Sequence, residues 1–346
     1  MRKPGETPLD SVGRIPARVA LGPGTEFDLI RELLGSEEPL SRGVLLGPGD
    51  DCTVLEGGFV ASTDLSVEEI HFRREWMSLP EVGYRAVAAA LSDLAAMAAE
   101  PLGALLSMAV DPAEASRVAV EVQLGAADAC RIEGIQILGG DLARSPGPLV
   151  LTVVALGRSD SPILRTGAAV GNEVWVTGWL GGSGAAVDLW KQGLAPPTDL
   201  RNSFVCPRPR IQEALWLAAR APLAGLIDLS DGLAGDAGHL AAASGLSLVL
   251  REASIPLHPG LQSLPHTCES PLHFSLQGGE DYELCFTVPP KTLDDWVSPF
   301  QDCFGLPLTK VGWAAEGEGV FLEAPGGEVR SLEKMGFNHF PSEEEG

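Results

Sequence analysis

The sequence predicts a protein of mixed α and β structure divided into two domains. Its 346 residues exceed the usual length of one domain, so two are expected. Strand-like and helix-like stretches are mixed along the chain, which indicates an α/β or α+β layered fold. The segment Ser159–Gly171 separates two such series and indicates a crossover between them. We expect a flexible tail at residues 1–22, domains at 23–158 and 159–340, and an acidic tail at 341–346.

The first series contains three expected helices. Thr25 can cap a helix that ends at Gly35. Pro80 opens a long helix that continues to about Ala99, and another helix is expected near 112–133. Strands are expected around 43–46, 52–56, 58–62 and 103–110, and at Ile135–Leu138 and Leu149–Leu156.

The second series begins with a strand at Glu173–Thr177, then a glycine-rich turn, Gly178–Gly184, that leads into a helix through Trp190. Pro207 and Pro209 precede another helix. The remaining expected elements are strands at Gly225–Leu229, Ser247–Leu250, Glu283–Val288, 308–313 and 319–323, and helices ending near Ser244 and spanning 291–300.

The composition excludes some classes of partner. The chain carries 47 acidic and 24 basic residues, a formal net charge of −23. Such a charge argues against binding to nucleic acids or anionic membranes. It is compatible with a protein that gathers divalent cations, although a solvated acidic surface explains most of it more simply.

Cysteine usage and the N-terminal segment indicate a cytoplasmic protein. Six cysteines are scattered without a Cys-x-x-Cys pair, which favours reduced thiols over a disulfide framework or a zinc site. The polar N-terminal segment lacks the apolar core of a signal peptide. The longest apolar helix, Ala86–Ala99, is too short to span a bilayer.

Acidic residues recur where strands end or helices begin. Asp50 and Asp51 follow the glycine-rich turn Gly47–Gly49. Adjacent carboxylates repel each other unless solvent or a cation intervenes. This stretch alone fits a solvated turn as well as a cation site.

Asp93 is the sharper indication. It lies with Ser92 in an otherwise apolar helical stretch, and a helix that is apolar nearly all round is buried. A buried carboxylate needs a partner or a metal. We therefore favour a metal or polar-network role over a lone solvent-facing aspartate.

Other acids stand beside small hydroxyl residues or glycines. Ser62-Thr63-Asp64 offers hard oxygen ligands suited to Mg²⁺, with an ordinary turn or helix cap as the alternative. In Asp228-Leu229-Ser230-Asp231 the acids end a strand and begin a helix, whose first amides favour phosphate.

Phosphate contacts are also expected from the first half of the chain. Bare glycines in Gly139-Gly140-Asp141 let backbone amides approach a phosphate. Arg165 in the crossover is placed to bind a phosphate, with an ordinary exposed arginine as the alternative. His71 lies in an acidic loop, where neighbouring acids favour its charged form. The sequence has neither a Walker-type loop nor the His-Arg-Asp and Asp-Phe-Gly motifs of protein kinases.

Taken in order, these motifs resemble those of bacterial thiamine-monophosphate kinases, from about Thr25 to Phe340. That family belongs to the aminoimidazole-ribonucleotide synthetase superfamily, with selenophosphate synthetase and a hydrogenase maturation protein as relatives. Two runs are specific to the kinase, the one from Ser62 to Phe72 and the one from Gly278 to Leu284. The motifs are Gly47–Cys52, Ser62–Phe72, Leu91–Met97, Leu138–Asp141, Ile227–Gly232 and Gly278–Leu284.

The resemblance implies a two-domain α/β fold of the aminoimidazole-ribonucleotide synthetase type and a homodimer whose N-terminal sheets join across the two-fold axis. It implies transfer of a phosphoryl group from ATP to thiamine monophosphate, with several bound Mg²⁺ ions. Because the acceptor is already a phosphate, we expect this transfer to be direct and in-line, assisted by Mg²⁺ and without a side-chain nucleophile. The implied metal ligands are Asp51, Ser62, Thr63, Asp64, Asp93, Asp141, Asp228 and Asp231; the implied ATP contacts are Gly140, Asp141, Arg165 and Ser230; and the implied thiamine-monophosphate contacts are His71, Glu280 and Phe337.

The chain departs from that family in two places. Leu142-Ala143-Arg144 replaces the usual threonines after Asp141, and Cys130-Arg131-Ile132 stands where a tyrosine is often found.

Three alternatives compete with the kinase. The first is a selenophosphate synthetase, whose reactive N-terminal cysteine has no counterpart here, because no cysteine precedes Cys52. The second is the hydrogenase maturation protein, which ends in a reactive cysteine, whereas this chain ends in Glu345-Gly346. The third alternative is a non-catalytic nucleotide- or thiamine-binding regulator, which would not need so many metal ligands.

Overall fold

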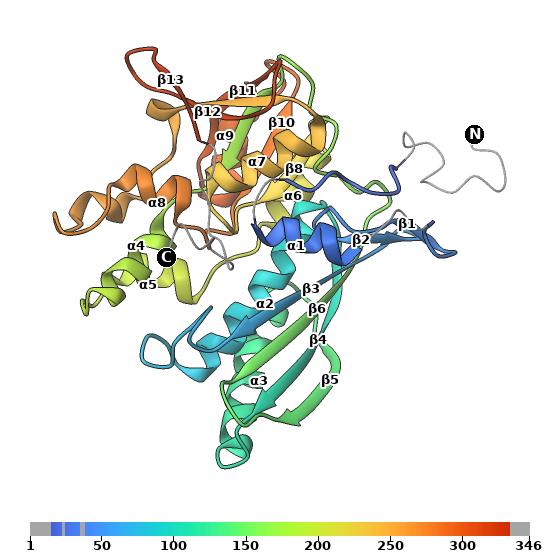
Figure 1. Ribbon diagram of the computed structural model, residues 1–346, viewed down its shortest axis with the longest axis vertical. Coiled ribbons are helices and arrows are strands. Elements are labelled where there is room, and N and C mark those ends of the chain that lie inside the picture. The colour runs from blue at the N-terminus through green and yellow to red at the C-terminus, as the bar shows by residue number, and fades with distance from the viewer. Residues whose placement is uncertain (1–14, 23–24, 35–38, 333–346) are drawn as a thin grey trace.

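The computed structural model describes residues 15–22, 25–34 and 39–332 and contains two β-sheets with associated helices. Helix α1 (Thr25–Leu34) precedes the first sheet. The first sheet ends at Arg158 and the second begins at Glu173, on either side of the predicted crossover (Figure 1). None of the helices in the described ranges is long and apolar enough to cross a membrane.

The first sheet has six strands in the order β1-β2-β3-β6-β4-β5. Only β4 and β5 run parallel, and the other neighbours are antiparallel. The strands are β1 (Val44–Leu46), β2 (Thr53–Leu55), β3 (Phe59–Val67), β4 (Glu100–Val110), β5 (Ile137–Arg144) and β6 (Val150–Arg158).

Two helices, α2 (Leu79–Ala96) and α3 (Ala115–Ile132), pack on one face of this sheet and against each other (Figure 1). Successive side chains of a strand point to opposite faces. Val153 and Leu106 are buried and therefore point to the helix-covered face. Asp64 is paired with Val153 and Gly140 is paired with Leu106, so these two residues lie on the same face.

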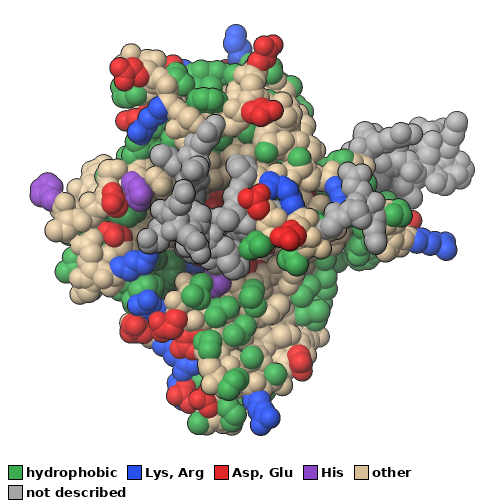
Figure 2. All heavy atoms as spheres, viewed as in Figure 1, with side chains coloured by type: hydrophobic (Ala, Val, Ile, Leu, Met, Phe, Trp, Pro, Cys, Tyr) green, Lys and Arg blue, Asp and Glu red, His purple; other side chains and the backbone are tan. Residues whose placement is uncertain are grey.

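The neighbouring row of the register, Leu65, Thr152, Ser107 and Asp141, therefore points to the opposite, open face. Figure 2 shows hydrophobic side chains spread over the lower half of the molecule, where this sheet lies. Leu65 on this face is 50% exposed.

The second sheet has seven strands in the order β13-β12-β9-β11-β7-β10-β8, antiparallel except for the β9–β12 pair. Its strands are β7 (Glu173–Thr177), β8 (Gly225–Asp228), β9 (Ser247–Arg251), β10 (Leu284–Val288), β11 (Leu308–Ala315), β12 (Gly319–Glu323) and β13 (Val329–Ser331). Its helices are α4 (Gly182–Lys191), α5 (Thr198–Val205), α6 (Ile211–Ala218), α7 (Leu233–Ser244), α8 (Pro271–Gln277) and α9 (Val297–Phe304), with 3₁₀ turns at Glu252–Ser254 and Pro259–Ser263.

Helix α2 lies between the two halves of the fold. Besides α3 and the first sheet it contacts α5, α6 and β8 of the second half. Its alanine-rich sequence suits this position, because small side chains allow close approach on every side. Fourteen residues that include Ser92 are buried along it, as the apolar pattern predicted.

Several boundaries differ from those predicted. The strand expected at Ile135–Leu138 continues to Arg144, so Gly139-Gly140-Asp141 lies within an edge strand and not in a turn after it. The strand expected to end near residue 62 continues to Val67. Pairing with a neighbouring strand overrides the turn tendency of glycine and of small polar residues in both cases.

Two helices were not predicted. In α8, Ser270 accepts a hydrogen bond from the His273 N–H at 3.1 Å and Pro271 occupies the first turn, a cap signal that the sequence does display. Helix α5 directly follows Pro197 and has only eight residues.

Two glycines set the separation of α2 and α3. A Cβ atom on Gly125 would lie 1.7 Å from the carbonyl oxygen of Pro80, and one on Gly83 would lie 1.9 Å from that of Val122. Each helix therefore presents bare backbone to the other, and no larger residue fits without separating them.

We predict that Gly125→Ala destabilises the protein. Alanine favours a helix by about 1 kcal/mol over glycine, but forcing a methyl group into a packed contact costs roughly 1–3 kcal/mol, and here the contacted atom belongs to rigid backbone. Urea unfolding should show a lower midpoint for this variant. Gly147→Ala is the control, because nothing lies within 4 Å of its Cβ position. Equal midpoints for the two variants would contradict the close approach.

Candidate functional site

The centre of the site is a group of three carboxylates. Asp51, Asp93 and Asp228 each offer an oxygen within 4.8 Å of the others. Asp51 precedes β2, Asp93 lies on α2, and Asp228 ends β8, so both halves of the fold contribute. Asp51 and Asp228 are buried and Asp93 is partly exposed. This arrangement can hold a divalent cation through oxygen ligands.

Hydroxyl groups orient two of these carboxylates. Ser62 on β3 donates a short hydrogen bond to Asp93 Oδ2. Ser92 on α2 donates to Asp228 Oδ2 at 2.6 Å. Ser92 therefore bonds to the second sheet, and the next residue of the same helix, Asp93, bonds to the first sheet.

The electrostatics of the group favour a bound cation. Burial, followed by the charge of Asp51, raises the pKa of Asp228 to about 7. Burial and the charge of Asp228 raise the pKa of Asp93 well above its usual value. Arg165 offsets part of the charge by donating to both oxygens of Asp51, at 2.7 and 3.1 Å. A single guanidinium cannot neutralise three carboxylates, so a metal ion fits the remaining charge.

The adjacent acids at the glycine-rich turn have different surroundings. Asp50 accepts hydrogen bonds from the backbone N–H groups of Asp51 at 3.0 Å and of Arg165 at 3.1 Å. It therefore joins the turn to the crossover segment, while Asp51 faces the carboxylate group. Burial, followed by the charge of Asp51, raises the pKa of Asp50 to about 7.

The remaining predicted ligands of the first sheet divide between its two faces. Asp64 points to the helix-covered face, where its charge contributes to the raised pKa of Asp93 after burial and the charges of Asp228 and Asp51. Thr63 and Asp141 point to the open face and are exposed. Within one chain the structure does not bring these two residues to the three carboxylates.

A second potential ligand group lies at the start of α7. Asp231, Asp236 and His239 offer atoms within 4.8 Å of one another. Asp236 Oδ2 accepts a hydrogen bond from the Asp231 N–H at 3.1 Å, and Ser230 lies just before this group. Burial, followed by the charge of Arg165, lowers the pKa of His239 to about 3, so its imidazole is neutral. These donors are suited to a cation.

Glu280 comes from the loop between α8 and β10 and has a left-handed backbone, with φ of 64°. Arg85 on α2 forms a short ion pair with its Oε2, and the Tyr282 hydroxyl donates to the same oxygen at 2.9 Å. Of the other predicted substrate contacts, His71 lies in the loop after β3, and Phe337 lies outside the described residues.

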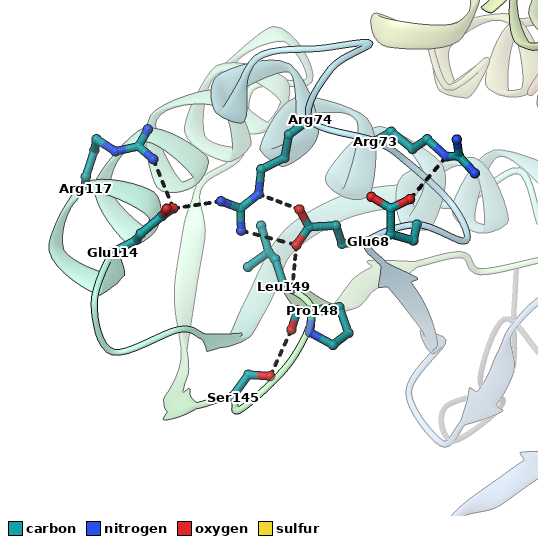
Figure 3. Close-up of polar contacts among 9 residues, drawn as sticks. Glu68, Arg73, Arg74, Glu114, Arg117, Ser145, Pro148 and Leu149 are labelled. Atoms are coloured by element: carbon teal, nitrogen blue, oxygen red, sulfur yellow. Dashed lines mark hydrogen bonds and ion pairs between the residues drawn. The ribbon is translucent and has the colours of Figure 1, made fainter. Parts of the chain in front are cut away.

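The loop that carries His71 is held at both ends. His71 Nδ1 accepts a hydrogen bond from the Val67 N–H at 3.0 Å. Glu68 pairs with Arg74 at 2.6 Å and accepts from the Leu149 N–H at 2.8 Å, and Arg74 continues to Glu114 at 2.7 Å (Figure 3). These contacts fix the loop against the β5–β6 turn and the segment before α3.

Comparisons with known proteins identify the family. The profile of "AIR synthase related protein, N-terminal domain" matches residues 49–159. The thiamine-monophosphate kinase of Rhodopirellula baltica is 32% identical, over 86% of this chain and 92% of that protein. That of Bacillus subtilis is 31% identical, over 91% and 99%. The chain belongs to the thiamine-monophosphate kinase family.

Solved structures agree with this assignment. The structure of AaThiL complexed with AMPPCP and TMP covers 92% of this chain and 97% of its own, with 29% identity and a TM-score of 0.77. A thiamine-monophosphate kinase from Stenotrophomonas maltophilia K279a covers 90% and 98%, with 31% identity and a TM-score of 0.71. The HypE–HypF complex, at 16% identity and a TM-score of 0.73, shares the fold.

The run Gly278–Leu284 gives each of its acids a different environment. Asp281 accepts a hydrogen bond from the Gly181 N–H at 2.8 Å and so occupies the amides at the start of α4. Glu283 forms two hydrogen bonds with Arg210, at 2.5 and 2.8 Å. Only Glu280 is left to face the junction of the two halves.

Sequence reasoning missed three residues of this site. Asp236 and His239 are buried on the mostly apolar α7, and a buried acid in an apolar helix is the same signal that singled out Asp93. Arg85 is buried on α2, and no local pattern reveals its partner, because Glu280 lies far away along the chain.

We predict a pH-dependent contribution of Asp281 to stability. Burial raises its pKa to about 8, whereas an unfolded aspartate titrates near 4. The folded state therefore binds more protons between about pH 4 and pH 8, and the contribution is lost as pH rises through that window. Asp281→Asn retains an acceptor oxygen and has no titrating proton.

The free energy of unfolding of the wild type minus that of Asp281→Asn should fall by a few kcal/mol from about pH 4 to pH 8. Urea unfolding in a chelator at constant ionic strength measures this difference. Asp302→Asn, a change at an exposed position, is the control variant. A flat difference for Asp281→Asn would contradict the shift.

Proposed function

We infer that this chain transfers a phosphoryl group from ATP to thiamine monophosphate, producing ADP and thiamine diphosphate for thiamine diphosphate biosynthesis. The observation that carries this inference is the group of Asp51, Asp93 and Asp228, built from both halves of a thiamine-monophosphate kinase fold. The AaThiL structure with AMPPCP and TMP supports these two substrate classes.

The residues present fit several Mg²⁺ ions. Asp51, Asp93 and Asp228 would hold one position, with Asp64 and Ser62 beside it. The Asp231 group at the start of α7, with Asp236 and His239, supports a second position. When bound, Mg²⁺ neutralises charge on the phosphates and aligns them.

We propose that Gly140, Arg165 and Ser230 contact ATP, and that His71, Glu280 and Phe337 contact thiamine monophosphate. Arg165 supports this division because its bond to Asp51 places a cation at the edge of the metal group. Glu280 supports this division because its carboxylate faces the junction from the second half of the fold, where it pairs with Arg85 of α2.

The proposed transfer is direct. A phosphate acceptor needs little deprotonation, so the main barrier is the approach of two polyanions. Positioning and charge neutralisation by the surrounding side chains supply the catalysis, and no side chain needs to act as a nucleophile. The configuration at the transferred phosphorus should therefore be inverted.

We propose that the chain forms a homodimer through the open face of its first sheet. Exposed Leu65 and the neighbouring half-buried Leu105, Val154 and Leu156 form an apolar surface there. Large contiguous apolar surfaces are unusual on monomers. A second copy against this face would also enclose Asp141.

We also propose a cytoplasmic location. All six cysteines are free thiols, and Cys52, Cys130 and Cys285 are buried. Unpaired cysteines of this number are typical of a reducing compartment.

A non-catalytic binding protein is the competing function, and one assay separates the two. We expect the purified chain with ATP, Mg²⁺ and thiamine monophosphate to produce equimolar ADP and thiamine diphosphate. Binding of both ligands without product would identify a regulator, and retention of configuration at phosphorus would contradict direct transfer.

We predict that Asp64→Asn lowers kcat on the order of 100-fold or more, because it removes a charge beside the carboxylate group. Its thermal unfolding should resemble that of the wild type, since Asp64 is partly exposed. Asp302→Asn, an exposed change on α9, should retain full activity. An active Asp64→Asn enzyme with an unaltered Mg²⁺ dependence would exclude Asp64 from the metal site.

For the dimer, we predict that Leu156→Glu produces monomers, because it places a charge in the middle of the apolar sheet face. Light scattering after size-exclusion chromatography measures the mass. Val120→Glu on α3 is the matched control, since Val120 is 60% exposed elsewhere. A monomeric wild type, or a Leu156→Glu dimer, would refute this interface.

A further inference from the structure

We propose that Arg85 is a positioning residue that holds Glu280 in its substrate-facing orientation across the domain junction. The proposal rests on the proposed function, in which Glu280 contacts thiamine monophosphate. Arg85 lies on α2, next to the first sheet, whereas Glu280 belongs to the loop that enters β10 of the second sheet.

The guanidinium of Arg85 is itself held in one orientation. Its Nη1 donates to the carbonyl oxygen of Phe204 at 3.0 Å, and its Cζ lies 4.0 Å from the centroid of the Phe204 ring. The side chain is only 7% exposed. A planar cation fixed on one face and at one nitrogen directs Nη2 toward Glu280.

Glu280 depends on such a contact more than an ordinary surface glutamate does. Its left-handed backbone is retained because its N–H bonds to the Ser230 oxygen at 2.7 Å and the Tyr282 N–H bonds to the Leu229 oxygen at 2.8 Å. These bonds fix the backbone at the end of β8 but leave the side chain free to rotate. Arg85 and the Tyr282 hydroxyl supply its two side-chain contacts given above.

A purely structural role for Arg85, as a tie between domains, is the alternative. The same helices provide a comparison, because one turn earlier on α2 Glu81 forms two hydrogen bonds with Arg201 of α5, at 2.8 and 2.9 Å. That pair also joins the two halves but does not touch Glu280. Arg201→Met therefore removes a tie between domains without disturbing Glu280.

The test is steady-state kinetics of the full-length protein with thiamine monophosphate and ATP varied separately. We expect Arg85→Met to raise the KM for thiamine monophosphate at least tenfold while the KM for ATP stays within twofold. We expect Arg201→Met to leave both constants within twofold. Equal kinetic effects of the two variants, or an equal rise in both KM values for Arg85→Met, would overturn the proposal.

A double variant tests whether Arg85 acts through Glu280. If it does, Arg85→Met combined with Glu280→Gln should raise the KM for thiamine monophosphate no further than Glu280→Gln alone. Multiplied effects would overturn the proposal, as would an unchanged KM for Glu280→Gln.

Tyr282→Phe provides a milder variant in case Arg85→Met does not fold. It removes only the hydroxyl contact, and we expect a several-fold rise in the KM for thiamine monophosphate with no change for ATP. An unchanged KM would contradict the proposed orientation of Glu280. Absence of thiamine diphosphate with the wild type would instead overturn the proposed function itself, so the two failures are distinguishable.

Discussion

The repulsion among three carboxylates at the domain junction is the constraint on which the site depends. Two like charges 4 Å apart repel by about 4 kcal/mol at an effective dielectric constant of 20. A stable fold tolerates Asp51, Asp93 and Asp228 together only because hydrogen bonds, one guanidinium and protons or cations compensate. The repulsion among these carboxylates therefore lowers the stability of the fold, and a bound cation would reduce that repulsion, as is typical of functional sites.

Helix α2 makes this arrangement possible. It is apolar enough to be buried between the two halves of the fold, and its polar residues Arg85, Ser92 and Asp93 reach partners in both halves. Ser92, Asp93 and Arg85 each bond to a different partner segment. The same helix therefore forms part of the core and positions residues of the site.

The sequence was informative where a residue conflicted with its surroundings. Asp93 in an apolar helix, and Asp228 at the end of an apolar strand, indicate the site from local sequence context alone. The long helices and most strands followed from periodicity, proline and glycine. Only the resemblance indicated that Asp51, and not Asp50, is the metal ligand. The adjacency of the two residues does not show which carboxylate faces the site.

The rest depended on long-range pairing, which local patterns do not contain. The partner of Arg85 lies in the other half of the chain, and the extension of β5 through Gly139 and Gly140 follows from its parallel neighbour β4. The two faces of the first sheet could not be assigned without the register. It is the register that separates Asp64 from Asp141.

The adjacency of Ser92 and Asp93 has a consequence for how this chain can evolve. Because one residue bonds to the second sheet and the next to the first, their spacing is fixed by the pitch of a single helix. An insertion or deletion before this point would rotate both side chains by about 100° and detach them together. Length variation among descendants should therefore accumulate in the hairpin turns and avoid the interior of α2.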